Sequence, residues 1–191
     1  GQLVSVGRIQ GESESTPISV ASIDAVVAAA VAAQPAWSAR SPSERAALLA
    51  AVAGQIDEER WATLAQMAAE AAKTVREGDP EVSEAIDFAR YYASATIPDG
   101  TIPYGVVVVA SPWNFPYAIP AGGALAAVMA GNTVILKPPP ETRQTAWLLA
   151  NQCWRAGIPR DVLQFVACPD DDVGRRLITH DDVATVVLTG S

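Results

Sequence analysis

A run of apolar, mostly β-branched residues at 105–110, Gly-Val-Val-Val-Val-Ala, constrains the fold of this chain more than any other segment. Such a run is typical of a strand covered on both faces, as in a parallel sheet. Strands and helices alternate after it, with strands expected at 133–136, 162–166 and 184–188 and helices at about 119–129, 141–156 and 173–178. This α/β alternation predicts a doubly wound, Rossmann-like parallel βαβαβαβ half-sheet over residues 103–191.

Residues 1–102 carry a helical pattern and are expected to form a layer that precedes the sheet. Residues 41–44 (Ser-Pro-Ser-Glu) form a capping box with proline at the first helical position, followed by apolar residues at three- and four-residue spacing. A further apolar stripe begins at Trp61, and Asp79-Pro80 is expected to open another helix. An earlier Ala-rich helix at about 23–34 should end at the proline that follows it. Nothing in this half carries chemistry by pattern alone.

The composition narrows the classes of function. With 13 Lys and Arg against 21 Asp and Glu, the net charge is -8, which disfavours nucleic acid and anionic membranes as partners because both are polyanions. The longest smooth apolar run, residues 25–33, is shorter than the roughly 20 residues that a bilayer span needs, so no membrane span is expected. Two cysteines make no disulfide framework, and a reducing cytoplasm is the expected location.

The most unusual motifs all follow predicted strands. They are Ser111–Asn114 after the first strand, Lys137 at the end of the second, and Thr189–Ser191 after the fourth. Because right-handed crossovers place the carboxyl ends of parallel strands at one edge, we expect these motifs to converge there and to line any ligand site. No G-x-G-x-x-G or P-loop motif follows the first strand, so a conventional Rossmann dehydrogenase and a P-loop kinase are disfavoured.

Two residues at this edge are candidates for chemistry. Asn114 lies between two aromatic residues and two prolines, so its amide could be a preorganised donor to an oxyanion, and a rigid strand-to-helix loop is an equally good interpretation. Lys137 is followed by three prolines, which must end the strand and are expected to expose its ammonium at the ligand edge. A solubilising surface lysine is the alternative.

The cysteines and the single histidine are expected to be structural. Cys153 lies in a helix body and Cys168 follows the third strand, and buried cysteine usually behaves as a small hydrophobe. His180 sits on a helix-to-strand connection away from the ligand edge, with no second ligand at a compatible spacing. We therefore expect a surface position for His180 and no metal site.

Several motifs resemble one family when they are taken in order. Ser-Pro-Trp-Asn-Phe-Pro at 111–116, Ala-Gly-Asn-Thr-Val at 130–134 with the following lysine, Ala-Gly-Ile-Pro at 156–159 and the closing Thr-Gly-Ser are similar to the first half of the NAD(P)-binding domain of aldehyde dehydrogenases. The resemblance implies that Asn114 is the oxyanion-hole asparagine and that Lys137 binds the adenosine ribose hydroxyls. The backbone of Ser111, Pro112 and Trp113 would line the nicotinamide side.

The same resemblance extends to the adenosine and pyrophosphate side. It implies that Gly190 and Ser191 open a helix against the pyrophosphate and that Gly174 packs near the adenine. The family often has glutamate three positions after the lysine, where this chain has Pro140, with Glu141 one position later. NAD is the expected cofactor, and these differences leave NADP open.

Two further residues bear on the substrate and on the cofactor. Another family glycine is Asp170 here, which is expected to repel a phosphate. Residues 77–92 resemble a helix of Δ1-pyrroline-5-carboxylate dehydrogenases, including the domain fused to proline dehydrogenase in bifunctional proline utilization A proteins. The resemblance implies that Glu84 lies near the active site and that Phe115 forms one wall of an aldehyde pocket.

The expected activity is the NAD-dependent oxidation of L-glutamate γ-semialdehyde to glutamate by a parent protein. In the family, the catalytic cysteine and glutamate lie beyond Ser191, so this chain alone is expected to be inactive. Expected partners are a small aldehyde, the remainder of the dehydrogenase, a fused or associated proline dehydrogenase, and further copies in a homo-oligomer. The alternatives are a non-catalytic structural or assembly domain, and a dehydrogenase for another aliphatic aldehyde such as succinate semialdehyde.

Overall fold

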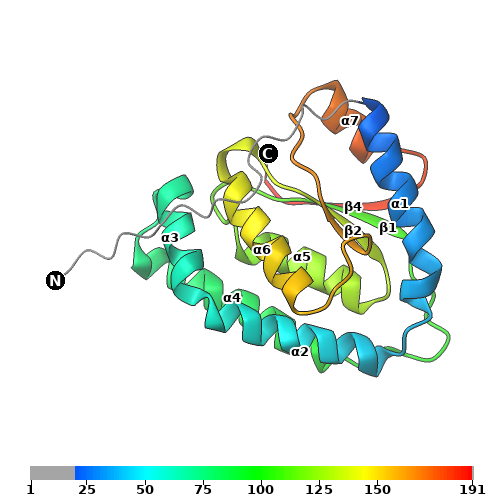
Figure 1. Cartoon of the computed structure of the whole chain (residues 1–191), viewed down its shortest axis with the longest axis horizontal. Coiled ribbons are helices and arrows are strands. Elements are labelled where there is room, and N and C mark those ends of the chain that lie inside the picture. The colour runs from blue at the N-terminus through cyan, green and yellow to red at the C-terminus, as the bar shows by residue number, and fades with distance from the viewer. Residues whose placement is uncertain (1–19, 191) are drawn as a thin grey trace.

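The computed structural model describes residues 20–190, which contain a four-stranded parallel sheet with helices on both faces (Figure 1). The strands are β1 (Val106–Ala110), β2 (Thr133–Lys137), β3 (Leu163–Phe165) and β4 (Val183–Leu188), in the spatial order β3-β2-β1-β4. All three pairings are parallel. The predicted parallel sheet and its strands are therefore confirmed, with ends that differ by a residue or two.

Seven α-helices and one short 3₁₀ helix are described between residues 20 and 190. Their bounds are α1 (Val20–Ser38), α2 (Pro42–Glu58), α3 (Arg60–Ala71), α4 (Val75–Ala93), α5 (Ala118–Met129), η1 (Pro140–Thr142), α6 (Arg143–Arg155) and α7 (Asp172–Ile178). α2, α3 and α4 form a helical layer behind α5 and α6, as predicted for this half of the chain, whereas α1 lies on the opposite face of the sheet. The others lie between strands, as the alternation predicted.

The side chains of β1 alternate between two cores. Val107 and Val109 belong to the larger core with residues of α2 to α6, whereas Val106 and Val108 belong to the smaller core with residues of α1 and α7. Figure 1 shows α5 and α6 on one face of the sheet and α1 and α7 on the other. All five residues of β1 are buried, as a two-faced central strand requires. The larger core joins helices from residues 42–93 to the sheet, so the helical layer and the sheet share one apolar interior.

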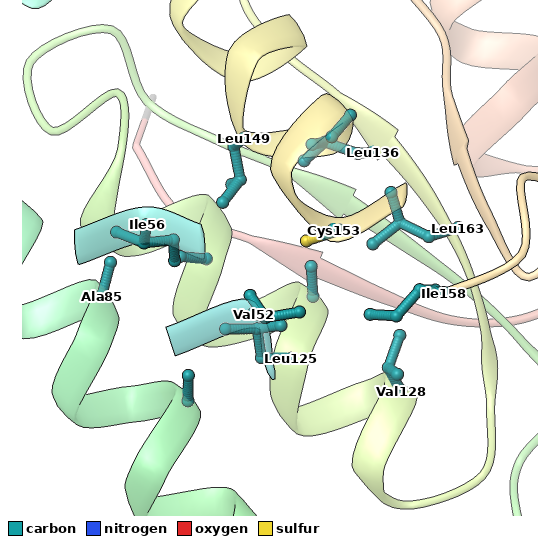
Figure 2. Packing of buried hydrophobic residues seen from close by; sticks show 14 of the residues in the cluster. Val52, Ile56, Ala85, Leu125, Val128, Leu136, Leu149, Cys153, Ile158 and Leu163 are labelled. Carbon is teal, nitrogen blue, oxygen red and sulfur yellow. The ribbon is translucent and has the colours of Figure 1, made fainter. Parts of the chain in front are cut away.

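Figure 2 shows this shared interior at close range. Val52 and Ile56 of α2 point toward Leu125 of α5, and Leu149 and Cys153 of α6 close the core against β2 and β3. The capping box that was predicted at 41–44 starts α2: Ser41 accepts a hydrogen bond from the Glu44 backbone N–H, and the Glu44 carboxylate accepts one from that of Ser41. The predicted apolar stripe of α2 is thus confirmed.

Two helices are longer than the sequence predicted. α1 continues through Pro35 to Ser38 because Trp37 is buried and donates its indole N–H to the Val128 carbonyl at 3.1 Å. α4 begins at Val75, with Thr74 as its cap in a second capping box, and Pro80 lies inside it. The predictions that prolines end α1 and open α4 are wrong, because each helix is fixed by contacts on either side of its proline.

The apolar stripe proposed from Trp61 is also wrong in part. Trp61 is 72% exposed, and the buried side chains of α3 are Thr63, Leu64 and Met67 instead. The stripe is therefore rotated around the helix axis by about 100° from the predicted one, which is the angle between successive residues of an α-helix. Leu64, the one predicted member that is buried, belongs to the larger core.

α1 is the one described helix that is long and apolar enough to cross a membrane by length and composition. In the structure, its side chains Ile23, Val27 and Ala30 are buried against the sheet. Its Asp24 carboxylate pairs with Arg176 of α7 at 2.8 Å. Within residues 20–190, α1 thus serves as a cover for one face of the sheet.

Candidate functional site

The carboxyl ends of β1, β2 and β4 lie side by side. In the register of the sheet, Ala110 is opposite both Lys137 and Leu188. The next residues continue the pairing, because Ser111 donates its N–H to the Lys137 carbonyl at 3.4 Å and Thr189 donates to the Ala110 carbonyl at 3.2 Å. The predicted convergence at one edge is confirmed for the described residues. Ser191 lies outside them.

Lys137 is buried at this edge. Its side chain is 8% exposed, and its ammonium forms an ion pair with the carboxylate of Asp170, which lies in the turn after β3. The prediction of a freely exposed ammonium is therefore wrong. The three prolines do end β2 as expected, but the turn after β3 folds over the side chain and supplies its counter-charge.

Gly174 of α7 packs tightly against the same turn. A Cβ atom added to Gly174 would lie 2.5 Å from the carbonyl oxygen of Pro169 and 4.0 Å from Cε of Lys137. Only glycine lets the backbone of α7 approach this turn so closely. Gly174, Asp170 and Lys137 are therefore one packed unit.

The Ser111 hydroxyl shows a feature that fits a bound ligand, and Gly190 packs against the residue that follows Ser111. Gly190 has a φ of +109°, and an added Cβ would lie 3.2 Å from Cβ of Pro112. The buried Ser111 hydroxyl oxygen makes no hydrogen bond within the described residues. A buried hydroxyl without a partner is costly, and a ligand could supply the missing bond. Both residues lie at the edge that holds Lys137.

The segment after β1 presents three side chains to solvent. Trp113, Asn114 and Phe115 are all exposed, and Pro112 and Pro116 on either side of them are buried. The Asn114 amide makes no hydrogen bond among residues 20–190 and is therefore available to a ligand. An amide of this kind can donate hydrogen bonds to a ligand oxygen.

A carboxylate that the sequence analysis missed anchors the end of this segment. Glu81 of α4 is 2% exposed, and its Oε2 accepts hydrogen bonds from the backbone N–H groups of Tyr117 at 3.1 Å and Ala118 at 3.2 Å. Its Oε1 pairs with Lys73. α5 has no side-chain cap of its own, so Glu81 serves as one from another helix. The sequence signal that could have identified Glu81 is its position as an acidic residue beside the buried stripe of α4.

Glu70 serves α6 in the same way. Its carboxylate accepts hydrogen bonds from the backbone N–H groups of Gln144 and Thr145 at 2.8 and 2.7 Å, and from the Thr145 hydroxyl at 2.7 Å. The amino ends of α5 and α6 are thus already occupied by carboxylates. Because an anion binds a helix terminus through free N–H groups, a pyrophosphate finds no such site at either helix.

The remaining predicted site residues are at the surface. Pro140 and Glu141 are exposed in η1, and Glu141 forms no ion pair with Lys137. Glu84 is exposed on α4, one turn after Glu81, and its carboxylate makes no hydrogen bond within the described part of the chain. Within residues 20–190, none of the three is joined to the edge by a hydrogen bond or an ion pair of its side chain.

The two cysteines are unsuited to nucleophilic catalysis. Both are buried, and burial raises the pKa of Cys153 to about 12 and also raises the pKa of Cys168. A thiol attacks as its thiolate, so a raised pKa makes it inert at neutral pH. The prediction that both are structural is supported by this burial.

His180 lies on the α1 side of the sheet, away from the edge. Its Nε2 is 3.4 Å from the Asp24 carboxylate, and its side chain is only 9% exposed. It is therefore more enclosed than the surface position that we predicted, because α1 reaches it with an acidic residue. Within residues 20–190 no group of three or more His, Cys, Asp and Glu could hold a metal ion.

A doubly wound sheet with these motifs at its carboxyl edge defines the class of protein. The profile described as aldehyde dehydrogenase family matches residues 13–191, and the chain belongs to that family. Aldehyde dehydrogenases are oxidoreductases, and the resemblance noted in the sequence is thereby confirmed.

Particular relatives narrow the comparison. The 1-pyrroline-5-carboxylate dehydrogenase of Geobacillus thermodenitrificans is 37% identical over 171 residues, which cover 81% of this chain and 33% of the relative. That of Bacillus subtilis, named 1-pyrroline-5-carboxylate dehydrogenase 2, is 33% identical over 202 residues, covering 97% and 38%. The chain thus spans about a third of the length of these curated relatives.

Solved structures show the same fold. Proline utilization A (PutA) from Bdellovibrio bacteriovorus matches with a TM-score of 0.84 and 32% identity, over 92% of this chain and 20% of that one. A NAD-dependent benzaldehyde dehydrogenase from Corynebacterium glutamicum matches with a TM-score of 0.86 and 28% identity, over 94% and 43%.

Proposed function

We propose that the intact protein oxidises L-glutamate γ-semialdehyde, the open form of 1-pyrroline-5-carboxylate, to glutamate with NAD+ as the oxidant. The observation that carries the proposal is that β2 ends at Lys137 beside the end of β1, from which the segment with the exposed Asn114 continues. The names of the similar dehydrogenases support the choice of substrate.

Asn114 would act on the aldehyde oxygen. When a thiolate adds to the carbonyl carbon, the oxygen gains negative charge, and an amide N–H already facing solvent at the end of β1 can stabilise it without reorganisation. One such donor is typically worth about 3 kcal/mol. Because Cys153 and Cys168 are buried, the thiolate must come from another part of the intact protein. Phe115 would form an apolar wall beside the aldehyde.

Residues at the edge would hold the cofactor, which supplies the hydride acceptor when it is bound. Lys137 would bind ribose hydroxyls, and Gly190, with Ser191 after it, would leave room for the pyrophosphate. The unpartnered Ser111 hydroxyl gains a bond in this arrangement, and the Pro112 and Trp113 backbone lines the nicotinamide side. The occupied amino ends of α5 and α6 support a pyrophosphate position at the β4 side instead.

The organisation of the intact protein is part of the same proposal. Residues 1–102 would form the helical segment and residues 103–191 the first part of the NAD-binding domain. The similarity to proline utilization A supports a fused or associated proline dehydrogenase, and we propose a homo-oligomer in the cytoplasm.

A second candidate is a non-catalytic aldehyde-dehydrogenase-like domain with a structural or assembly role. The Lys137–Asp170 ion pair favours it, because the ammonium that would bind the ribose already has a partner. Oxidation of another aliphatic aldehyde, such as succinate semialdehyde, is the alternative within the enzyme class. The exposed and unbonded Asn114 amide favours catalysis over the structural role.

The test is an assay of the intact protein for NADH formation with glutamate semialdehyde, succinate semialdehyde and propanal. We expect the highest kcat/KM with glutamate semialdehyde, and we expect Asn114→Ala to lower kcat by about 10²- to 10³-fold. The matched control is Asn151→Ala on α6, where the amide only bonds the Trp147 carbonyl at 2.8 Å. The 191-residue chain alone should form no NADH.

Three results would contradict the proposal. An intact protein that forms no NADH with any aldehyde, and whose NAD+ affinity is unchanged by Lys137→Ala, would support the structural role. Equal loss of activity in the two asparagine variants would remove the oxyanion assignment. A higher kcat/KM for succinate semialdehyde or propanal would replace the substrate.

A further inference from the structure

The Lys73–Glu81 ion pair is a buried charged contact of a kind that costs stability unless both charges are fully bonded. Glu81 is 2% exposed and the Lys73 side chain 13%. Taking such charges out of water costs several kcal/mol for each ion. A protein with apolar residues of similar size in place of a buried ion pair is often at least as stable. Packing alone therefore does not account for the pair, and its contacts indicate what it does.

Outside the pair itself, the hydrogen bonds and the ring contact of the two charged side chains all lead to the segment that carries Asn114 or to the residues just after it. Glu81 binds the Tyr117 and Ala118 backbone N–H groups, and the Lys73 ammonium lies 4.4 Å from the centroid of the Phe115 ring, a cation–π distance. Lys73 lies between α3 and α4, and Glu81 lies in α4. The helical layer thus touches this segment at Phe115 and just beyond it.

The segment is fixed at both of its ends. On one side Ser111 continues the pairing of β1 with β2. At the other end, the buried Tyr117 makes two hydrogen bonds. Its backbone N–H donates to the Glu81 carboxylate, and its hydroxyl donates to the Gln152 side-chain carbonyl at 2.5 Å. Trp113, Asn114 and Phe115 lie between these anchors and are exposed. Within residues 20–190, the Lys73 contact with the Phe115 ring is the only hydrogen bond, ion pair or ring contact that reaches this exposed part.

We propose that the Lys73–Glu81 pair is a positioning device for the Asn114 amide and the Phe115 ring. Glu81 fixes where the segment enters α5, and Lys73 fixes the ring that follows Asn114, so the orientation of the amide depends on both charges. The catalytic part of this inference rests on the proposed function, since Asn114 matters to the reaction only if it faces the substrate. Lys73 and Glu81 touch no reacting atom in this proposal.

Hydrogen exchange of the intact protein tests the hold on the segment without any assay of activity. In Glu81→Ala, the amides of the peptide 113–121 should exchange at least about tenfold faster than in the wild type, because two of them lose their acceptor. The peptide 49–56 of α2 should be unchanged. The matched control is Arg60→Gln, which removes the Arg60–Asp79 ion pair (2.6 Å) between α3 and α4 and does not reach the segment.

Kinetics of the intact protein test the consequence. Lys73→Met should lower kcat by about 10- to 100-fold with little change in the KM for NAD+, because an interaction made in the transition state is lost. Lys73→Arg, which keeps the charge, should restore most of the rate. The double variant Lys73→Met/Glu81→Gln avoids an unpaired buried charge, so it should fold, and it should still be slow.

Two results would overturn the proposal. Exchange in 113–121 that stays at the wild-type rate in Glu81→Ala would show that the pair does not hold the segment. A double variant with wild-type kcat would show that the pair is only structural. Absence of aldehyde oxidation in the wild type would instead contradict the proposed function, and the exchange experiment would still decide whether the pair holds the segment.

Discussion

The ammonium of Lys137 and the carboxylate of Asp170 form an ion pair at the carboxyl edge of the sheet. The lysine is nearly buried, whereas the aspartate side chain is 67% exposed, so the charge that solvent and ligands meet here is the negative one. A ligand that binds Lys137 therefore has to share it with Asp170. This relationship gives the edge a preference among anionic ligands.

We expect Asp170→Asn to change the choice of cofactor. Removing the carboxylate should raise the ratio of the NADP+ affinity to the NAD+ affinity of the intact protein by about two- to fivefold, because NADP+ carries an additional phosphate. This is the size of effect expected of a largely exposed charge. Calorimetric titration of the protein with each cofactor measures the two affinities and hence their ratio.

Asp172→Asn is the matched control for this change. Asp172 is exposed in the first turn of α7 and has no ion-pair partner in the described structure. A similar shift in the two variants would mean that net charge, and not the pair with Lys137, sets the preference.

Two glycines in helices should respond in opposite directions to alanine. Gly174→Ala should destabilise the protein by about 1–3 kcal/mol, because its Cβ would lie 2.5 Å from the Pro169 carbonyl oxygen. Gly54→Ala in α2 meets nothing within 4 Å and should stabilise it by about 0.5–1 kcal/mol. Denaturant unfolding of both variants gives the two values. A Gly174→Ala protein as stable as the wild type would mean that α7 can move away from the turn.

Burial of Cys153 makes stability depend on alkaline pH. Its folded pKa of about 12 is above the unfolded value, so its contribution is fully present below about pH 8.5 and is lost as the unfolded thiol ionises above that pH. Between pH 8 and 10, the wild type should lose about 1.5–2 kcal/mol more than Cys153→Ala. Denaturant unfolding of both proteins across this range measures the difference, and parallel curves would show that the thiol ionises equally in both states.

The Glu70 cap should contribute to the stability of α6. Glu70→Ala leaves the N–H groups of Gln144 and Thr145 without their acceptor and should cost about 1–2 kcal/mol. Glu58→Ala is the control, because that exposed carboxylate accepts only a 3.4 Å hydrogen bond from Gln55. Thermal unfolding compares the two variants. Equal midpoints would mean that water replaces the carboxylate at α6 without loss.

Local sequence signals were sufficient for the sheet and for the place where its motifs meet. The β-branched run at 105–110 and the proline stop after Lys137 act within a few residues, so they can be interpreted without tertiary information. Helix ends were less predictable. Pro35 and Pro80 lie inside helices because Trp37 and Thr74 fix the chain on the far side of each proline.

The charged contacts of the site could not be predicted in this way. Glu81 bonds to a backbone group 36 residues away, and Lys137 pairs with an aspartate 33 residues away. Asp170 was expected only to repel a phosphate, because its pairing depends on how the turn after β3 folds over β2. The prediction that Pro80 opens α4 also places Glu81 in the first turn of that helix. An acidic residue is favourable there because of the helix dipole, so no distant partner had to be expected.

The caps that Glu70 and Glu81 supply to α6 and α5 bear on the design of a minimal cofactor-binding module. A protein engineer who trimmed the chain to begin at Pro103 would keep every strand and each motif at the sheet edge. The trimmed module would nevertheless lose both acceptors of its helix amino ends, together with the apolar cover of α5 and α6. A workable module must therefore retain α1, α2, α3 and α4, or rebuild both caps and the apolar cover of both layers within its own sequence.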